Sequence, residues 1–426
     1  MDEVYNGMEN TGKNENKRQT LLILLCWFAY FTSYFGRYSY NANIIPIENA
    51  FGVSHSQSGL VVTFYFFSYG AGQIIHCLLC KKYSFRYVIA GAMAVAATVN
   101  LAIGFGLPFA TMKYAFVLNG LAQAALWPSI ITILSRNLDE KYLKRSTFAM
   151  STPVTLGTLS IYGISAICAL FGGYRTPFII SGSVIAVGAF IWVLSYGKLA
   201  NEAYAKTDEK QETNEPVKTD KSKFIPTLIL LASFAIIVNF LKDGLQTWVP
   251  SIMKESFGLG DSLSLFLTLA LPVFGMIGSL TGVFFHSLIP DFVVHAGLNF
   301  AISAALLIAV MFLIGTPLYV LVLVCFSLVM FLSHGSNNII TSVAPLGLRK
   351  HFNSGMLAGL LNGCCYLGST ISSYGLGAIA DAAGWSGVSV TLLVAALIPV
   401  AAAIIFTVVG SVKKRSAKPT DDEKTI

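Results

Sequence analysis

The chain alternates between long apolar stretches and short polar connections along almost its whole length. Apolar windows of about 20 residues, the length of a helix that crosses a bilayer, recur twelve times. The predicted spans cover residues 20–45, 57–79, 85–107, 112–135, 146–170, 175–197, 224–249, 262–288, 292–314, 317–341, 352–378 and 385–411. The pattern therefore predicts an all-α membrane protein with twelve transmembrane helices.

The one long polar interruption lies between the sixth and seventh spans. It is rich in Lys, Glu, Asp and Thr and too poor in apolar residues to build a core, so we interpret it as a linker. The predicted domains are a cytoplasmic tail (1–19), a six-helix bundle (20–197), the linker (198–223), a second six-helix bundle (224–411) and a second cytoplasmic tail (412–426).

Short motifs recur in the two halves at a nearly constant interval. Phe51-Gly52 follows the first predicted span, and Phe257-Gly258 follows the seventh. Tyr162-Gly163 in span five recurs as Tyr374-Gly375 in span eleven, at a slightly longer interval. Ordered echoes of this kind indicate an internal duplication, and two similar bundles suit alternating access to a site near the bilayer midplane. We therefore predict two pseudo-symmetric six-helix bundles.

Composition agrees with a membrane protein, and charge predicts its orientation. Of the 426 residues, 55% are hydrophobic and 12% are charged, whereas about 25% charged is usual in soluble domains. Most of the 28 Lys and Arg residues fall in the two tails and in the connections on the same side as the tails. This bias predicts cytoplasmic termini in the plasma (inner) membrane. It also accounts for the net charge of +7 without a nucleic-acid partner.

The sequence shows no catalytic or cofactor motif. Its seven cysteines fall in or beside the spans without metal-ligand spacing, so we predict neither a metal nor a cofactor. It also lacks the spacing of a catalytic triad, a glycine-rich phosphate loop and the filter motif of a channel. We therefore predict that the protein is not an enzyme. We also predict that it is a monomer in the lipid bilayer and that it acts on a small solute.

The strongest candidate for function is Arg37, a charge inside the first span. A charge near the bilayer midplane costs roughly 2.5–3.5 kcal/mol on insertion scales, so it persists where it faces protein, water or a ligand. Tyr34 and Tyr30 lie three and seven residues before Arg37, and Asn41 lies four after it. At this spacing the four side chains share one helix face. We predict that this polar stripe binds an anion.

Span seven carries the other deep charges, Lys242 and Asp243. Asn239, Lys242 and Gln246 share a helix face, and Lys242 occupies roughly the place that Arg37 has in the first half. We predict that Arg37 and Lys242 face each other across a central cavity. Two alternatives stay open: Lys242 neutralises Asp243, or both side chains lie near a membrane interface.

Other polar residues in the spans are weaker candidates. Gln123 in span four, Asn337 in span ten, and Asn362 and Tyr366 in span eleven are predicted substrate-binding residues. For Asn362 and Tyr366, cavity lining and hydrogen bonding between helices are equally open. His334 in span ten is a candidate for carrying protons near neutral pH, although a single histidine in a helix interface is more often structural.

With these residues the chain resembles the major facilitator superfamily over essentially its whole length, and within it the organophosphate:phosphate antiporters. Tyr30, Tyr34 and Arg37 match the tyrosines and the arginine that this family presents to phosphate from its first helix. Gln123 with Trp127-Pro128 is similar to the family's Q-G-x-G-W-P stretch. The resemblance implies that a phosphate ester is exchanged for inorganic phosphate.

The seventh span both resembles this family and departs from it. Asn239 and Lys242, followed by Trp248 and Pro250, stand where the family has Y-x-x-R and a later W-x-P. Lysine is a point charge without the planar fork that arginine offers to a phosphate. Asp243 beside it cancels part of its field.

Two other functions are consistent with the same residues. A proton-coupled symporter of carboxylates such as sugar acids needs a titrating carboxylate, and Asp243 is the sole deep one. A sensor of the same fold would bind its ligand without moving it. The leading prediction is a secondary transporter of a small organic anion by alternating access, with exchange for inorganic phosphate as the favoured mode.

Overall fold

The computed structural model describes residues 2–79, 84–200, 224–348, 352 and 354–416. The regular secondary structure in these ranges is helical. The first half contains α1 (Asp2–Tyr38), a 3-10 turn (Asn41–Asn43), α2 (Ile44–Phe51), α3 (His55–Leu79), α4 (Phe85–Gly104), α5 (Phe109–Gln123), α6 (Leu126–Asn137), α7 (Glu140–Ala149), α8 (Pro153–Ala169) and α9 (Arg175–Leu199). The second contains α10 (Ile225–Phe257), α11 (Asp261–Leu267), α12 (Ala270–Leu288), α13 (Phe292–Leu313), α14 (Tyr319–Asn338), a π turn (Ile339–Val343), α15 (Ala344–Gly347) and α16 (Ser354–Ser416).

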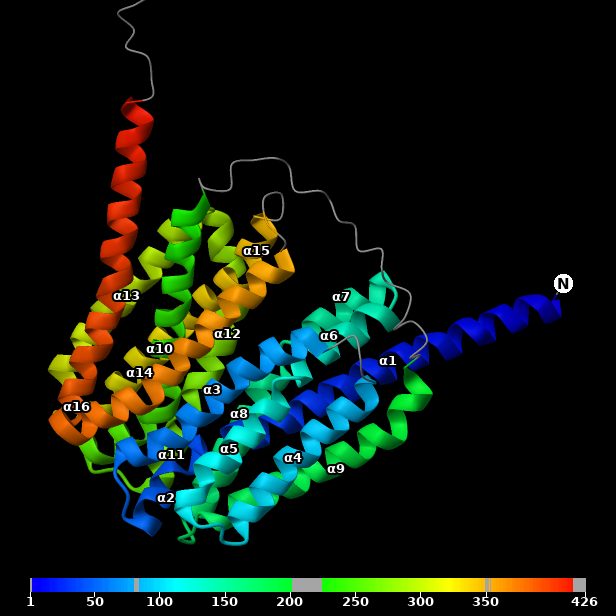
Figure 1. Ribbon diagram of the computed structural model, residues 1–426, viewed down its shortest axis with the longest axis horizontal. Coiled ribbons are helices and arrows are strands. Elements are labelled where there is room, and N and C mark those ends of the chain that lie inside the picture. The colour runs from blue at the N-terminus through cyan, green and yellow to red at the C-terminus, as the bar shows by residue number, and fades with distance from the viewer. Residues whose placement is uncertain (1, 80–83, 201–223, 349–351, 353, 417–426) are drawn as a thin grey trace, which may run out of the picture.

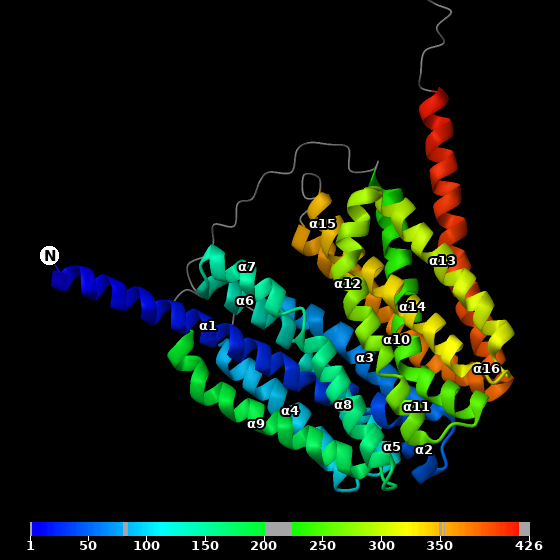
Figure 2. The ribbon, with the colours of Figure 1, turned by 180° about the vertical axis from the view of Figure 1, so that it is seen from behind.

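The helices form two bundles, which Figures 1 and 2 show from opposite sides. One bundle contains α1 to α9 and the other α10 to α16. The bundles meet mainly where α3 packs along α16 and where α8 packs against α11. The start of α1 and the end of α16 lie on the side that we call the terminal face, with α7 and α15 (Figure 1). The opposite side, with α2 and α11, is called the distal face.

The helices account for the twelve predicted spans. Eleven helical stretches within the described ranges are long and apolar enough to cross a membrane. The last of them, Met356–Val408, has 53 residues, which is enough for two crossings. Gly384 interrupts it with non-helical backbone (φ 65°, ψ −173°), and α16 turns back on itself in Figure 1. The fold is therefore an all-α membrane fold of twelve helices in two pseudo-symmetric bundles.

Several spans are broken rather than continuous. Span one stops at Tyr38, passes through the 3-10 turn at Asn41–Asn43 and resumes as α2. Span five divides between α7 and α8, where Pro153 occupies the first turn of α8. Proline has no N–H to donate and fits a helix start better than a helix interior. The break in span one leaves Arg37 beside the end of α1.

The two predicted limits of the linker fall close to helix ends, at Leu199 and Ile225, whereas the limits of both tails fall inside helices. α1 begins at Asp2, inside the predicted N-terminal tail, and α16 continues to Ser416, beyond the predicted end of the second bundle. Most of the predicted linker, residues 201–223, lies outside the described residues. The domain limits therefore stay predictions.

Six glycines with left-handed backbone close the connections on the distal face. They are Gly52, Gly106 and Gly172 in the first bundle and Gly258, Gly315 and Gly384 in the second, with φ between 60° and 105°. Residues with a Cβ rarely adopt such angles. Taken in order, the three glycines of the second bundle correspond to the three of the first at a nearly constant interval. The turn geometry therefore repeats with the internal duplication.

Candidate substrate-binding site

Arg37 lies in a cage of aromatic rings between the bundles. Its Cζ is 4.6 Å from the ring centroid of Tyr69, which is on α3. Its Nη2 donates a hydrogen bond of 3.4 Å to the hydroxyl of Tyr366, which is on α16 in the second bundle. Five more rings lie within 6.0 Å of Cζ: Tyr34, Tyr38, Tyr65, Phe66 and Tyr366. Ring faces attract a guanidinium, so the cage positions this charge where the two bundles meet.

The guanidinium of Arg37 has an N–H donor that is not used within the protein. Its Nε is buried without a hydrogen-bond partner. Within the described part of the chain, Arg37 forms no ion pair with a carboxylate. A desolvated charge without an anion is costly. Arg37 is therefore suited to receive an anion from outside the protein.

The two tyrosines predicted beside Arg37 lie on the same side of α1. The hydroxyls of Tyr30 and Tyr34 are 3.3 Å apart, and their rings meet edge to face with centroids 5.2 Å apart. The ring of Tyr30 also packs 4.8 Å from Trp127 of α6. The predicted stripe of Tyr30, Tyr34 and Arg37 therefore exists on the helix, and the ring of Tyr34 is also part of the cage.

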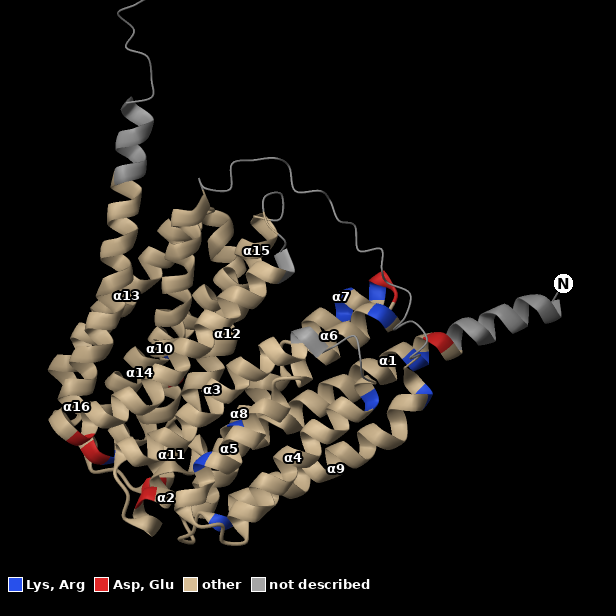
Figure 3. Cartoon of the chain, viewed as in Figure 1, with Lys and Arg blue, Asp and Glu red and all other residues tan. Residues whose placement is uncertain are grey.

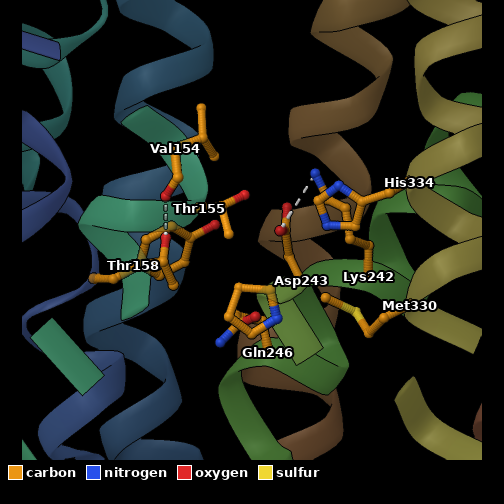
Figure 4. A pocket seen from close by; sticks show the side chains of 10 residues that line it. Val154, Thr155, Thr158, Lys242, Asp243, Gln246, Met330 and His334 are labelled. Atoms are coloured by element: carbon orange, nitrogen blue, oxygen red, sulfur yellow. Dashed lines mark hydrogen bonds and ion pairs between the residues drawn. The ribbon is translucent and has the colours of Figure 1, made fainter. Parts of the chain in front are cut away.

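A small cavity lies between the bundles around Lys242 and Asp243, and Figure 4 shows its side chains. Its volume is about 30 Å³. It is lined by Tyr38 of α1, by Val154, Thr155 and Thr158 of α8, by Lys242, Asp243 and Gln246 of α10, by Pro272 of α12, and by Met330 and His334 of α14. One histidine and one aspartate are fewer than the three protein ligands of a typical zinc site.

Lys242 and Asp243 form an ion pair in this cavity. The Nζ of Lys242 is 3.5 Å from Oδ1 of Asp243, and both side chains are largely buried. The hydroxyl of Ser369 on α16 also donates to Asp243. The alternative in which Lys242 neutralises Asp243 is thus realised in this conformation, and Lys242 brings little net charge to the cavity.

The cavity does not join Arg37 to Lys242. Arg37 is absent from its lining, whereas the adjacent Tyr38 belongs to it. A cavity of about 30 Å³ has room for a few water molecules and not for a solute of sugar size. A sugar phosphate or sugar acid therefore needs the bundles to part before it can touch both basic groups. Gln246 lines the same cavity and has a buried Nε2 that lacks a hydrogen-bond partner.

Three of the predicted polar residues, Asn239, Asn337 and Asn362, instead join helices to each other, and Gln123 bonds within its own helix. Nδ2 of Asn239 donates to Oδ1 of Asn337 (2.8 Å) within the second bundle. Nε2 of Gln123 donates to Oδ1 of Asn119 (2.7 Å) within α5. Nδ2 of Asn362 donates across the bundles to Oε1 of Gln73 (2.6 Å). These amides already have protein partners, so in this conformation they are structural.

Asn41 marks the pseudo-twofold relation between the bundles. Its Nδ2 donates a 2.8 Å hydrogen bond to Oγ1 of Thr247 in the second bundle. The interval from Asn41 to Thr247 equals that from Gly52 to Gly258, so the two bonded residues are structural equivalents. Equivalent atoms that touch must lie near the symmetry axis. Asn41 therefore fastens the bundles at the axis and is not free to bind an anion here.

Several residues near the two basic groups were not predicted from the sequence. Tyr65 and Tyr69 of α3 contribute rings to the cage, and Thr155 and Thr158 of α8 line the cavity. Tyr65 and Tyr69 are four residues apart and Thr155 and Thr158 three apart, so each pair shares a helix face. That spacing was the available signal, but it does not say which neighbouring helix the face meets.

The protein has a helical membrane fold of two pseudo-symmetric bundles with buried charges between them. This combination is typical of membrane transporters. The chain belongs to the Major Facilitator Superfamily, whose family model matches residues 26–351. It is 23% identical over 397 residues to the membrane sensor protein UhpC of Escherichia coli strain K12, covering 88% of this chain and 89% of that protein.

Two further comparisons agree with this assignment. The probable hexose phosphate transport protein of Chlamydia pneumoniae is 20% identical over 87% of both chains. A solved structure of a bacterial homologue of the human lysosomal transporter Spinster, inward-facing and unoccupied, matches with a TM-score of 0.78 at 15% identity. That match covers 91% of this chain and 96% of the other, and it shows the fold. The predicted family resemblance is confirmed.

Proposed function

We propose that this protein is a secondary transporter that carries a small organic anion by alternating access. The main support for the proposal comes from Arg37. Its guanidinium lies between the bundles and lacks a carboxylate partner among the described residues. Rings from both bundles surround it, so an anion bound there would touch both halves. A solute that touches both halves can favour the transition between their two arrangements.

The anion that we propose is a phosphate ester, exchanged for inorganic phosphate. Arg37 with the hydroxyls of Tyr34 and Tyr366 offers charge-assisted and neutral donors to several phosphate oxygens at once. The name of the Chlamydia pneumoniae relative, a probable hexose phosphate transport protein, supports this choice. In an exchange mechanism, two anions compete for the same positively charged site. The protein changes between its two arrangements more easily when this site is occupied than when it is empty.

We also propose that the terminal face is cytoplasmic. Figure 3 shows Lys and Arg near this face on α7 and at the outer part of α1, beside a few acidic residues, whereas the distal face has Asp and Glu at α2 and the bend of α16 together with some basic residues near α5. Positive charge collects on cytoplasmic sides. The bundles contact each other near the distal face through α8 and α11. With this orientation we assign the conformation as inward-facing, and the bond between Asn362 and Gln73 also joins the bundles toward the terminal end of α3.

A second candidate is a proton-coupled symporter of carboxylates such as sugar acids. The ion pair between Lys242 and Asp243 favours it, because the pair leaves Arg37 as the one uncompensated charge at the centre of the described chain. A single positive charge matches a monoanion better than a dianion. Asp243 would then be the carboxylate that takes up the proton.

A third candidate is a sensor of the same fold, and the relative named membrane sensor protein UhpC favours it. Counterflow in proteoliposomes separates transport from sensing. The purified chain is reconstituted with unlabelled anion inside and labelled anion outside, and labelled anion accumulates if the protein is a carrier. Tight anion binding without counterflow would contradict the transporter proposal and support a sensor.

The same vesicles distinguish the two transport modes. Inorganic phosphate, a hexose phosphate and a hexuronate are each loaded inside as counter-substrate. Exchange predicts that internal phosphate accelerates uptake of the phosphate ester and that an imposed pH gradient alone does not drive it. Uptake of the hexuronate driven by the pH gradient, with no effect of internal phosphate, would replace the first proposal by the second.

A further inference from the structure

One histidine joins the two bundles at the distal face, well away from the central cavity. His55 is the first residue of α3. Its Nδ1 is 3.2 Å from Oε1 of Glu48 on α2, in the same bundle, and its Nε2 is 3.2 Å from Oε2 of Glu255 on α10, in the other bundle. The indole N–H of Trp385 donates to the same oxygen of Glu255 at 2.9 Å. We call Glu48, His55 and Glu255 the distal latch.

The arrangement of the latch favours an additional proton. A neutral imidazole has one N–H and one lone pair, so it can donate to one carboxylate only. Here Nε2 is hydrogen-bonded to Oε2 of Glu255, while Nδ1 and Oε1 of Glu48 lie 3.2 Å apart, both buried and without a hydrogen-bond partner. Two lone pairs at that distance repel each other, so this contact is favourable when His55 carries both N–H groups or when Glu48 holds the second proton. Burial raises the pKa of Glu48, although the contact with His55 opposes this effect. In either case, the three side chains together hold one proton more than a neutral imidazole and two ionised carboxylates would hold.

The other groups around His55 strengthen its hold on a proton. Asp381 of α16, in the second bundle, accepts the backbone N–H groups of His55 and Ser56 at 3.0 and 2.9 Å. The rings of Trp248 and Trp385 are 5.7 and 5.0 Å from the imidazole. Three carboxylates therefore surround this histidine, two of them from the opposite bundle. This arrangement favours a positive charge on His55.

The lysine next to Glu255 in the sequence is already paired. Lys254 precedes Glu255 on α10, but its Nζ lies 2.9 Å from Oδ1 of Asp261 and donates to Oδ1 of Asn49 at 3.2 Å. The side chain of His55 is 18% exposed and that of Glu255 40% exposed. The latch is therefore close enough to water on the distal side to exchange its proton there.

We propose that the distal latch is a proton-binding site that closes the distal face, so that proton uptake from the distal side stabilises the arrangement in which the bundles touch there. When the bundles part, Glu255 and Asp381 leave with the second bundle and Glu48 alone stays beside His55. The open arrangement therefore binds the proton more weakly. The inference depends on alternating access and not on which anion is carried.

Linkage fixes the direction of the effect. Because the closed arrangement has the higher proton affinity, the closed state is favoured at low pH and is lost as the pH rises through the range in which the latch gives up its proton. One linked proton changes the ratio of closed to open molecules by at most about tenfold per pH unit. By reciprocity, a solute that favours distal opening releases a proton to the distal side.

The test measures the opening of the distal face as a function of pH in the full chain. Spin labels are attached through Phe171→Cys, between α8 and α9, and Leu318→Cys, between α13 and α14, in a background without other cysteines. Both native side chains are exposed, at 84% and 51%. Distance distributions are recorded in lipid nanodiscs by double electron–electron resonance between about pH 5 and 9. We expect the population with the longer distance to grow as the pH rises.

Variants assign the response to the latch. His55→Gln should remove the pH dependence. His55→Lys should keep the distal face closed at every pH, because its charge is retained. His286→Gln, a histidine at the terminal end of α12, is the matched control and should respond like the parent. Glu255→Gln leaves His55 in place and should move the transition to lower pH, which keeps the test valid if His55 variants fold poorly.

Two results would overturn the proposal. The first is a pH response that persists unchanged in both His55→Gln and Glu255→Gln. The second is a parent protein whose distance distribution stays the same throughout the pH range. In either case His55 and its carboxylates would be a structural contact without a switching role.

Discussion

The first and seventh spans descend from the same half-sequence but carry charge in opposite ways. At the interval that relates Asn41 to Thr247 and Gly52 to Gly258, the equivalent of Arg37 is Asp243, and Lys242 is its neighbour. Arg37 has rings around it and no carboxylate among the described residues, whereas Lys242 is paired with Asp243. The duplication has preserved the backbone turns and has let the charges diverge.

This difference indicates a division of labour. The first bundle supplies the net positive charge that attracts an anion. The second supplies a pair whose members can separate, so Lys242 becomes available to the solute only if Asp243 finds another partner, such as Ser369 or a proton.

Arg37→Ala should abolish uptake. Loss of one partner of a buried charge pair costs roughly 2–5 kcal/mol of binding free energy, or at least about thirtyfold in affinity. The midpoint of thermal unfolding should hold, because no carboxylate is left without its partner. Counterflow and anion binding check the outcome. Arg175→Ala, at an exposed arginine of the distal face, is the control, and transport retained by Arg37→Ala would remove Arg37 from the site.

Asp243→Asn should change the preference between anions. Without the carboxylate, Lys242 adds a second uncompensated charge, so affinity for a dianion relative to a monoanion should rise by up to about tenfold, or about 1.4 kcal/mol. Competition between inorganic phosphate and a hexuronate measures the ratio. If Asp243 couples protons, the same variant also makes uptake independent of a pH gradient. An unchanged ratio together with an unchanged response to the gradient would assign Asp243 to structure alone.

Lys242→Arg should keep or modestly improve affinity for a phosphate ester. The planar fork of arginine donates to two phosphate oxygens at once, which lysine cannot do. We expect a gain of a few fold, measured by displacement of bound phosphate ester. Loss of all binding would instead show that Lys242 serves only as the partner of Asp243.

Tyr366→Phe should weaken anion binding by a few fold. Its hydroxyl contacts Arg37 at 3.4 Å, a long hydrogen bond, and a typical bond of this kind contributes about 0.5–1.5 kcal/mol. The ring, which also packs 4.7 Å from Tyr69, stays in place. Tyr374→Phe, at a partly exposed tyrosine of the same helix, is the matched control. Equal affinities in Tyr366→Phe and the parent would place the anion away from this hydroxyl.

The spans, the duplication and the two basic positions could be predicted because each depends on local pattern. Apolar length determines a span, and a charge within one is conspicuous. The roles of Asn41, Gln123, Asn239 and Asn362 could not be predicted. An amide in a membrane helix serves a solute or another helix equally well, and only the packing shows that Asn362 meets Gln73.

The aromatic cage and the distal latch were beyond sequence reasoning for the same reason. Tyr69 and Tyr366 are far apart in the chain, yet their rings pack together around Arg37. Glu48 and Glu255 lie on different bundles, and nothing in their own neighbourhoods marks them as partners of His55. Such contacts exist in one arrangement of the bundles, and a linear pattern does not encode which arrangement is populated.

The six left-handed glycines show how the halves could grow apart in length without losing their correspondence. The stretch from Gly258 to Gly315 is slightly longer than its counterpart from Gly52 to Gly106, and the following stretch to Gly384 is longer by the same amount. Each increment is close to one helical turn of about 3.6 residues. An insertion of three residues turns a helix by about 300°, so it leaves the following segment about 60° from its former orientation. Much of a broad inward-facing stripe therefore still faces inward after the insertion.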